Sequence, residues 1–225
     1  MPTRGTFDRE LKELQDEVLL LASMVDHAIE RSIEALKNRD LAEAERIIAH
    51  DADINRKRFD IEERALLLIA TQQPMASDLR FIAAVLSIIT DLERMADYAE
   101  GIAKITISLG DEPPIKPLVD IPRMASVTRR MFSQAMDAFV SRDAEAAKRV
   151  ALQDDEVDDL YNQVYRELLV FMIQDPRTIS RATYLTWVAH NLERIADRVT
   201  NICERVVFTV TGIMEEMDAW AQTPK

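Results

Sequence analysis

The chain has 225 residues, of which 48% are hydrophobic and 30% charged, and its formal net charge is −12. Such an acidic chain is a poor match for nucleic acid, because phosphate backbones are bound by basic surfaces. A single cysteine excludes an internal disulfide and a cysteine-based zinc site. With only 4 glycines, 8 prolines and 6% aromatic residues, the composition favours long helices over sheet.

Neither a signal peptide nor a membrane span is visible in the sequence. The first residues contain no apolar segment of the kind that a signal peptide requires. The most apolar run, residues 81–89, is about half as long as a bilayer-spanning helix. We therefore expect a cytoplasmic protein that meets a membrane only indirectly, through a partner.

Apolar residues recur at three- and four-residue spacing through the first half of the chain, which is typical of amphipathic helices. Pro74 interrupts this pattern, and proline opens a helix far better than it continues one. We predict three helices in this half, over residues 7–37, 41–72 and 75–109.

The second half follows a clear linker and repeats the same plan. The linker is marked by Gly110 and by three prolines, Pro113, Pro114 and Pro117. The apolar pattern then resumes and predicts three further helices, over residues 121–140, 143–174 and 177–216.

An internal repeat relates the two halves. Residues 92–97 read LERMAD and residues 192–197 read LERIAD, and about 80 residues of each half align around them. This length exceeds that of the common solenoid repeats and suits a duplicated domain. We predict an all-α fold of two tandem antiparallel three-helix bundles, over residues 1–112 and 118–225.

Acidic residues are repeated along with the helices. The third helix of each half carries two acids four residues apart, Glu93 with Asp97 and Glu193 with Asp197, so each pair shares one helix face. The second helices carry matching motifs, in the form Asp51-x-x-x-Asn55 in the first half and Asp154-x-x-x-Asp158 in the second.

The turns bring these motifs to one height. Asn55 lies 19 residues before Pro74 and Glu93 lies 19 residues after it. The second half repeats this arrangement around Pro176, with separations of 18 and 17 residues. In an antiparallel helix hairpin, residues that are equally far from the turn along the chain lie at the same level along the helix axes. Asp51 lies in line with the apolar seam and Glu93 beside it, so the pattern leaves open how the acids face one another.

Carboxylates gathered at one height call for a cation. Hard oxygen ligands favour Mg²⁺, Ca²⁺, Mn²⁺ or iron over copper and zinc. His190, one turn before Glu193, is a peripheral candidate. The predicted metal ligands are Asp51, Asn55, Glu93, Asp97, Asp154, Asp158, Glu193 and Asp197.

Two other interpretations compete with a metal-binding protein. Acidic pairs at this spacing are common on solvated helices, so the chain could be a structural scaffold that binds no metal. A carboxylate-bridged di-metal enzyme would need Glu-x-x-His motifs on inward helix faces. None of the three histidines has a glutamate three residues before it. The sequence therefore gives no support to a di-metal enzyme of this kind.

The combined motifs resemble the PhoU family of phosphate-signalling regulators over residues 7–216. The resemblance is carried by the third-helix phrase Leu-Glu-Arg-x-Ala-Asp in both halves, by Asp51-x-x-Ile54, and by Gln73-Pro74 followed by Asp78-Leu79-Arg80. It implies a cytoplasmic, non-enzymatic negative regulator of phosphate uptake and phosphate-starvation signalling. The implied partners are the ATPase subunit of the phosphate ABC transporter and a sensor histidine kinase, and a homodimer is plausible.

The resemblance also implies metal clusters, of iron in some members, held by paired acidic motifs at the eight candidate positions. This sequence departs from the pattern at Asn55, where an acid is expected, so the first site should be the weaker. Ser180-Arg181-Ala182 replaces the Asp-Leu-Arg tripeptide in the second half. Our hypothesis is that bound cations neutralise the acids, fix the packing of the second and third helices, and so present a surface to the partners.

Overall fold

A computed structural model describes residues 4–216 of the chain. These residues form seven α-helices and one 3₁₀ turn, and no strand occurs among them. The elements are α1 (Arg4–Asn38), α2 (Leu41–Gln72), α3 (Ala76–Leu109), α4 (Asp120–Ser141), α5 (Ala144–Ala151), α6 (Asp154–Gln174), η1 (Pro176–Thr178) and α7 (Ile179–Thr211). Residues 1–3 and 217–225 of the two predicted bundles lie outside this range.

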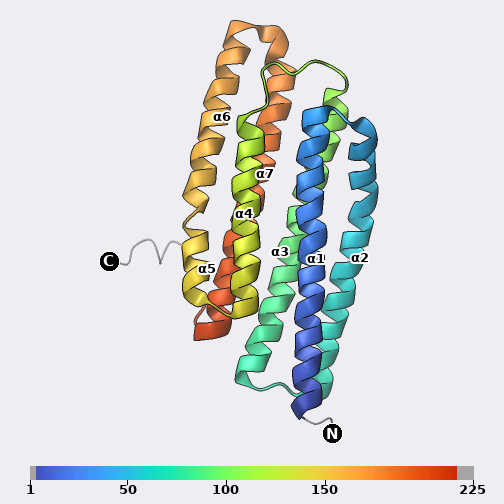
Figure 1. Cartoon of the computed structure of the whole chain (residues 1–225), viewed down its shortest axis with the longest axis vertical. Coiled ribbons are helices and arrows are strands. Elements are labelled where there is room, and N and C mark those ends of the chain that lie inside the picture. The colour runs from blue at the N-terminus through green and yellow to red at the C-terminus, as the bar shows by residue number, and fades with distance from the viewer. Residues whose placement is uncertain (1–3, 217–225) are drawn as a thin grey trace, which may run out of the picture.

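The helices form two three-helix bundles that lie side by side along the long axis of the molecule (Figure 1). α1, α2 and α3 make the first bundle, and α4, the α5–α6 pair and α7 make the second. The third helices, α3 and α7, run antiparallel and pack against each other in the middle. The predicted all-α fold of two tandem bundles is therefore confirmed.

One hydrophobic core runs through both bundles. Leu92 and Met95 of α3 and Leu192 and Ile195 of α7 are fully buried and belong to the same cluster of apolar side chains. Truncating a buried leucine or methionine to alanine typically costs about 2–5 kcal/mol. The three- and four-residue spacing of apolar residues that predicted the helices therefore also builds the core.

The first turn of each bundle is fixed by an arginine and an aspartate. Arg39 and Arg142 adopt left-handed backbone conformations, with φ of 55° and 54°, which end α1 and α4. Asp40 and Asp143 then cap the next helix, because each carboxylate accepts a hydrogen bond of 2.9 Å from a backbone N–H three residues on.

The predicted helix over residues 143–174 is wrong in one respect, because it is interrupted at Leu152 and Gln153. There the N–H of Gln153 bonds to the carbonyl of Val150, three residues back, in place of an α-helical bond. The apolar pattern runs through this turn and hides it. The new helix α6 begins with Asp154, Asp155 and Glu156, and negative charge stabilises a helix N-terminus.

The last predicted helix also ends earlier than expected, at Thr211 where residue 216 was predicted. Gly212 follows with φ of 76°, a left-handed conformation that glycine adopts without steric cost. At the start of the same predicted helix, residues 176–178 form the short η1 turn, so that α7 begins at Ile179.

The two copies of the repeated phrase meet where α3 crosses α7. Asp91 of α3 accepts a hydrogen bond of 3.2 Å from Asn201 Nδ2 of α7 and lies 3.5 Å from Arg198 Nη1. At the symmetric place Gly101 faces Asn191, and a Cβ there would lie 2.9 Å from Asn191 Nδ2. The repeated phrase thus lies at the centre of the contact between the bundles.

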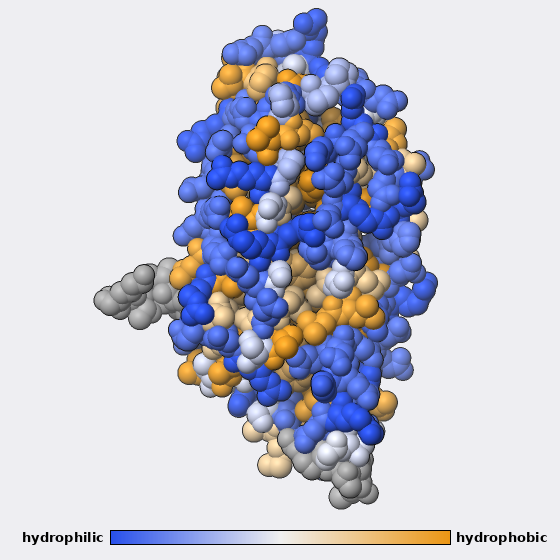
Figure 2. Space-filling view, viewed as in Figure 1, coloured by the Kyte–Doolittle hydropathy of each residue, from blue (hydrophilic) through white to orange (hydrophobic). Residues whose placement is uncertain are grey.

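The face of the molecule seen in Figure 2 is mostly hydrophilic, with hydrophobic side chains gathered in patches. Two of the exposed apolar pairs lie at equivalent positions of the repeat, Leu66 with Leu67 on α2 and Leu169 with Val170 on α6. None of the helices over residues 4–216 has the length and hydropathy needed to cross a membrane.

Candidate functional site

The four predicted acids of the second bundle come together between α6 and α7. Asp154, the first residue of α6, is 8% exposed. Burial raises the pKa of its carboxyl to about 7, and the negative charges of Asp158, Asp197 and Glu193 contribute to the shift. Without a cation, burial and the neighbouring acids therefore favour the protonated form of this group.

Glu193 has a side-chain oxygen that lacks a hydrogen bond. Its Oε2 is buried and accepts no hydrogen bond from the described residues. His190 Nδ1 lies 3.2 Å from this oxygen, a contact that becomes an ion pair only when the ring is protonated. Burial and the charge of Asp197 raise the pKa of Glu193. A buried anionic oxygen of this kind is costly unless a cation reaches it.

The first bundle gathers its acids in the same way, between α2 and α3. Burial raises the pKa of Asp51, and the charges of Glu100, Asp97 and Glu93 raise it further. Asn55 Nδ2 donates a hydrogen bond of 2.7 Å to Asp51 Oδ2. The amide that replaces an acid here therefore acts within the protein as a donor to the neighbouring carboxylate.

The sequence-based prediction missed two residues of the first cluster, Glu100 and Lys104. Glu100 lies one turn beyond Asp97 and two turns beyond Glu93, so the helical spacing of its charge could have found it. Lys104 Nζ lies 2.6 Å from Glu100 Oε2 and partly neutralises the group. The position equivalent to Glu100 in α7 is Thr200, so the two clusters differ here as well.

Arginines inside the repeated phrase donate hydrogen bonds to Asp97 and Asp197, the last residue of each copy. Arg94 Nη1 donates to Asp97 Oδ2 at 3.0 Å, and Arg194 Nη1 donates to Asp197 Oδ2 at 2.5 Å. With the side chains in these positions, no group of three or more His, Cys, Asp or Glu residues within 4–216 is arranged to hold a metal ion. A cation would have to displace the arginine from Asp197.

The chemistry of the second cluster suits a hard cation. Four carboxylates, one of them buried and one with a buried oxygen that accepts no hydrogen bond, provide the ligand atoms that Mg²⁺, Ca²⁺, Mn²⁺ and iron prefer. The first cluster has three acids from the predicted set, an amide, and the added Glu100–Lys104 pair. Its net negative charge is smaller, which makes it the poorer cation site.

Arg194 also connects the two clusters. A hydrogen bond between its side chain and Tyr98 of α3 is the largest cause that raises the pKa of its guanidinium, and the charge of Asp197 adds to it. Tyr98 follows Asp97 of the first cluster directly. One arginine therefore touches an acid of the second cluster and a neighbour of the first.

Comparison with known proteins identifies the family. The model of the PhoU domain matches residues 18–106 and 121–206. A PhoU homolog described as a phosphate-specific transport system accessory protein, from Aquifex aeolicus, is 41% identical over 83% of this chain and 84% of its own length. A second, from Clostridium acetobutylicum, is 38% identical over 93% of this chain and 96% of its own length.

Solved structures agree with the sequence match. The crystal structure of PhoU from Pseudomonas aeruginosa superposes with a TM-score of 0.87 and 34% identity, over 92% of this chain and 100% of that one. The phosphate transport system regulatory protein PhoU from Streptococcus pneumoniae gives a TM-score of 0.87 at 32% identity, over 93% of this chain and 99% of that one. The chain belongs to the PhoU family.

Proposed function

We propose that the protein is a cytoplasmic, non-enzymatic accessory protein of a phosphate-specific transport system. In this role it restrains phosphate uptake and represses the phosphate-starvation response when phosphate is plentiful. Its partners are the ATPase subunit of the phosphate ABC transporter and the sensor histidine kinase of that response. Family membership supports this role, as do the accessory-protein names of relatives that match most of the chain.

The acidic clusters are the proposed means of regulation. Asp154, Asp158, Glu193 and Asp197 would hold the cation in the second bundle, and Asp51, Asn55, Glu93 and Asp97 in the first. A bound divalent or trivalent cation would supply positive charge that allows the carboxylates of neighbouring helices to stay ionised. The single observation that carries this proposal is the buried Asp154, whose pKa is raised to about 7 by burial and by the charges of four neighbouring acids.

The proposed partner surface lies on the outer faces of the second helices. Leu66 and Leu67 on α2 and Leu169 and Val170 on α6 are each at least 41% exposed. Exposed apolar side chains that recur at equivalent positions of a duplicated chain favour contact with a partner or with a second copy of the protein. The helices that bear them also carry half of the proposed ligands, so cation binding would act on the same helices that present this surface.

The direct test measures partner binding with and without metal. The full-length protein, loaded with Mn²⁺ or treated with a chelator, is titrated against the purified ATPase subunit and against the cytoplasmic part of the kinase. We expect binding to the loaded protein and at least a tenfold weaker affinity, about 1.4 kcal/mol, for the metal-free protein. Equal affinity in both states would remove the regulatory role of the metal.

A cellular assay separates the physiological role from the metal. In cells that lack the gene, a reporter driven by a phosphate-starvation promoter should be active in rich phosphate, and the wild-type protein should silence it. The variant with alanine at Asp154, Asp158, Glu193 and Asp197 should fail to silence it. A control with asparagine at the exposed Asp53 and Asp60 should act like the wild type. A wild-type protein without effect on the reporter would refute the phosphate-regulation proposal.

A further inference from the structure

The internal repeat gives the residues beside the first acidic cluster counterparts beside the second. Equivalent residues lie 103 positions apart in the second helices and 100 positions apart in the third helices. Two positively charged residues of the first bundle, Arg58 of α2 and Lys104 of α3, have counterparts without a positive charge, which are Tyr161 of α6 and Glu204 of α7. The two clusters therefore differ in the cations that the protein itself supplies.

Arg58 brings a positive charge from α2 to the acids of α3. Its side chain is only 21% exposed, its Nη1 lies 2.8 Å from Glu62 Oε2 one turn along α2, and its Nε is buried. Burial and the charge of Asp97 raise the pKa of Glu93, whereas the charge of Arg58 lowers it. Arg58 therefore acts on a carboxylate of the neighbouring helix as a nearby cation does.

Lys104 brings a second positive charge to the first cluster. Its Nζ lies 2.6 Å from Glu100 Oε2. Burial and the charge of Glu100 raise the pKa of Asp51, whereas the charge of Lys104 lowers it. Asn55 adds its hydrogen bond of 2.7 Å to the same carboxylate. The first bundle thus meets its acids with two cations and an amide that the second bundle does not have.

Tyr161 occupies the place of Arg58 in the second bundle without carrying its charge. Its ring lies beside that of His190, with the two ring centroids 6.1 Å apart. Burial and the charge of Glu193 raise the pKa of its hydroxyl, so Tyr161 is neutral at neutral pH. Glu193 therefore has an aromatic ring near it where Glu93 has the charge of an arginine.

Glu204 reverses the charge at the position of Lys104. Burial is the largest cause that raises the pKa of the Cys203 thiol, and the charges of Glu204 and Asp154 both contribute, so these two carboxylates lie near the same buried thiol. Glu204 is itself paired with Arg205 at 3.5 Å. Within residues 4–216, Arg194 is the only arginine or lysine that pairs with one of the four acids of the second cluster. This cluster therefore keeps most of its negative charge.

The backbone of the two bundles differs at the same level. α2 runs without interruption through Asp51, whereas the equivalent helix is interrupted at Leu152 and Gln153 and α6 begins at Asp154. The buried acid of the first bundle thus lies inside a continuous helix, and that of the second lies at the end of one. A change of charge at the second cluster therefore acts beside a joint in the chain.

We propose that Arg58 and Lys104 take the place of a bound cation in the first bundle, so that only the second bundle depends on the metal. This inference rests on the proposed function, because it requires a cation at the second cluster. The built-in cations hold α2 and α3 together whether or not metal is present. In the second bundle the bound cation joins the first turn of α6 to α7, and its removal loosens the joint between α5 and α6.

Hydrogen–deuterium exchange of the full-length wild-type protein, with Mn²⁺ or with a chelator, separates the two bundles. We expect Mn²⁺ to slow amide exchange at least about fivefold over residues 150–160 and to change it by less than about twofold over the equivalent residues 47–57. Equal protection of both segments would overturn this inference and leave the proposed cation sites in place. Calorimetry without any Mn²⁺ binding would instead remove the proposed cation site, and this inference with it.

Tyr161→Arg gives the second cluster the built-in cation of the first. It should weaken Mn²⁺ binding at the second cluster at least about tenfold and raise the urea midpoint of the metal-free protein. Tyr161→Phe is the matched control, because it keeps the ring and adds no charge, and it should bind Mn²⁺ like the wild type. Wild-type affinity in Tyr161→Arg, or equal weakening in both variants, would refute the role of the charge.

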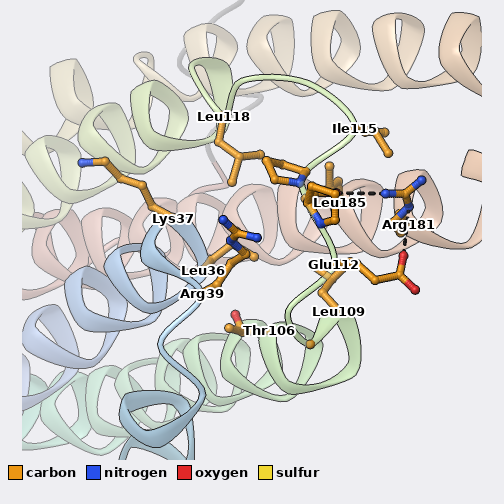
Figure 3. A pocket seen from close by; sticks show the side chains of 13 residues that line it. Leu36, Lys37, Arg39, Thr106, Leu109, Glu112, Ile115, Leu118, Arg181 and Leu185 are labelled. Atoms are coloured by element: carbon orange, nitrogen blue, oxygen red, sulfur yellow. Dashed lines mark hydrogen bonds and ion pairs between the residues drawn. The ribbon is translucent and has the colours of Figure 1, made fainter.

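The reverse variant combines Arg58→Tyr with Lys104→Gln in the quadruple alanine variant of the second cluster, where only the first cluster can bind. We expect Mn²⁺ affinity at least about tenfold tighter than that of the quadruple variant itself. The control in the same background is Arg181→Gln, which removes a cation of α7 that pairs at 3.3 Å with Glu112 of the linker, outside both clusters (Figure 3). Equal affinity in the reverse variant and in this control would overturn the proposal. Because Tyr161→Arg is made in the wild-type background, it decides the matter even if the combined variant does not fold.

Discussion

Asn55 donates a hydrogen bond of 2.7 Å from its amide nitrogen to the carboxylate of Asp51, one helical turn away. At the equivalent place in the second bundle, Asp158 presents Asp154 with another negative charge, which helps to raise the pKa of Asp154. One repeat therefore provides its half-buried acid with a hydrogen bond from within the protein. In the other repeat, the acid has to be neutralised by a proton or by a cation.

Asn55→Asp should make the first cluster resemble the second. The change removes the hydrogen bond to Asp51 and adds a like charge, so the metal-free variant should lose about 1–3 kcal/mol of unfolding free energy. Its affinity for Mn²⁺ at the first cluster should rise. Chemical denaturation in a chelator and calorimetric titration measure the two effects. The reverse change, Asp158→Asn, should stabilise the metal-free protein and weaken the second site, and the same sign of effect in both variants would contradict the account.

Arg194→Gln should strengthen cation binding at the second cluster. Arg194 donates a hydrogen bond to Asp197 at 2.5 Å and is about one third exposed, so it competes with a cation for that carboxylate. Partly exposed pairs of this kind are worth about 1 kcal/mol or less, which corresponds to a gain in affinity of at most about fivefold. A matched control is Arg177→Gln, which removes an arginine paired with Asp175 outside the clusters. A weaker Mn²⁺ affinity in Arg194→Gln would show that the arginine supports the site and does not compete for it.

The stability of the metal-free protein should fall as the pH rises through the range set by Asp154. The pKa of this carboxyl is raised from 3.8 in the unfolded chain to about 7 in the folded protein. Between these values the folded state keeps a proton that the unfolded state has released, so raising the pH favours unfolding. The loss attributable to Asp154 is about 4 kcal/mol at most.

Urea denaturation in a chelator between pH 5 and pH 8 measures this dependence, over a pH window that follows from the pKa of about 7. Asp154→Asn removes the titrating group and should flatten the curve, with a gain in stability at the upper end of the range. Saturating Mn²⁺ should flatten the wild-type curve as well, because a cation takes the place of the proton. A wild-type protein that becomes more stable as the pH rises over this range would contradict the placement of Asp154.

The contact between the bundles should depend on Asp91 as a hydrogen-bond acceptor more than as a charge. Burial raises the pKa of Asp91 although Asn201 and Arg198 both oppose the shift. Asp91→Asn keeps an oxygen for Asn201 and should change the unfolding free energy by less than about 1 kcal/mol. Asp91→Ala leaves Asn201 and Arg198 without this partner and should cost about 1–3 kcal/mol. Denaturation of both variants, with the exposed Asp53→Ala as control, tests whether Asp91→Ala is less stable than Asp91→Asn.

Local signals in the sequence predicted the helices well. The second helix was predicted over residues 41–72 and has those bounds. Asp40 caps its start, and Gln73, which adopts a left-handed backbone conformation just before Pro74, ends it. The interruption at Leu152 and Gln153 was missed because it changes the backbone hydrogen bonding without changing the spacing of the apolar residues. Helix boundaries are read from caps, whereas a turn inside a continuous apolar stripe has no such mark.

The candidate site was only partly predictable for a different reason. Counting from the turns placed the acids of neighbouring helices at one height, since a hairpin fixes height from chain distance alone. Nothing local reveals that Arg194 reaches Tyr98 of the other bundle, or that α3 and α7 cross at the repeated phrase. Those contacts depend on how the two three-helix bundles pack against each other, and they join residues about 100 apart in the chain.

The central claim is that the carboxylates of α6 and α7 form a cation site. Calorimetric titration of Mn²⁺ into the metal-free protein tests it most directly, with the quadruple alanine variant at Asp154, Asp158, Glu193 and Asp197 measured alongside. We predict saturable heat for the wild type and the loss of the tighter binding step in the variant. No heat from the wild type, or the same heat from both proteins, would contradict the claim.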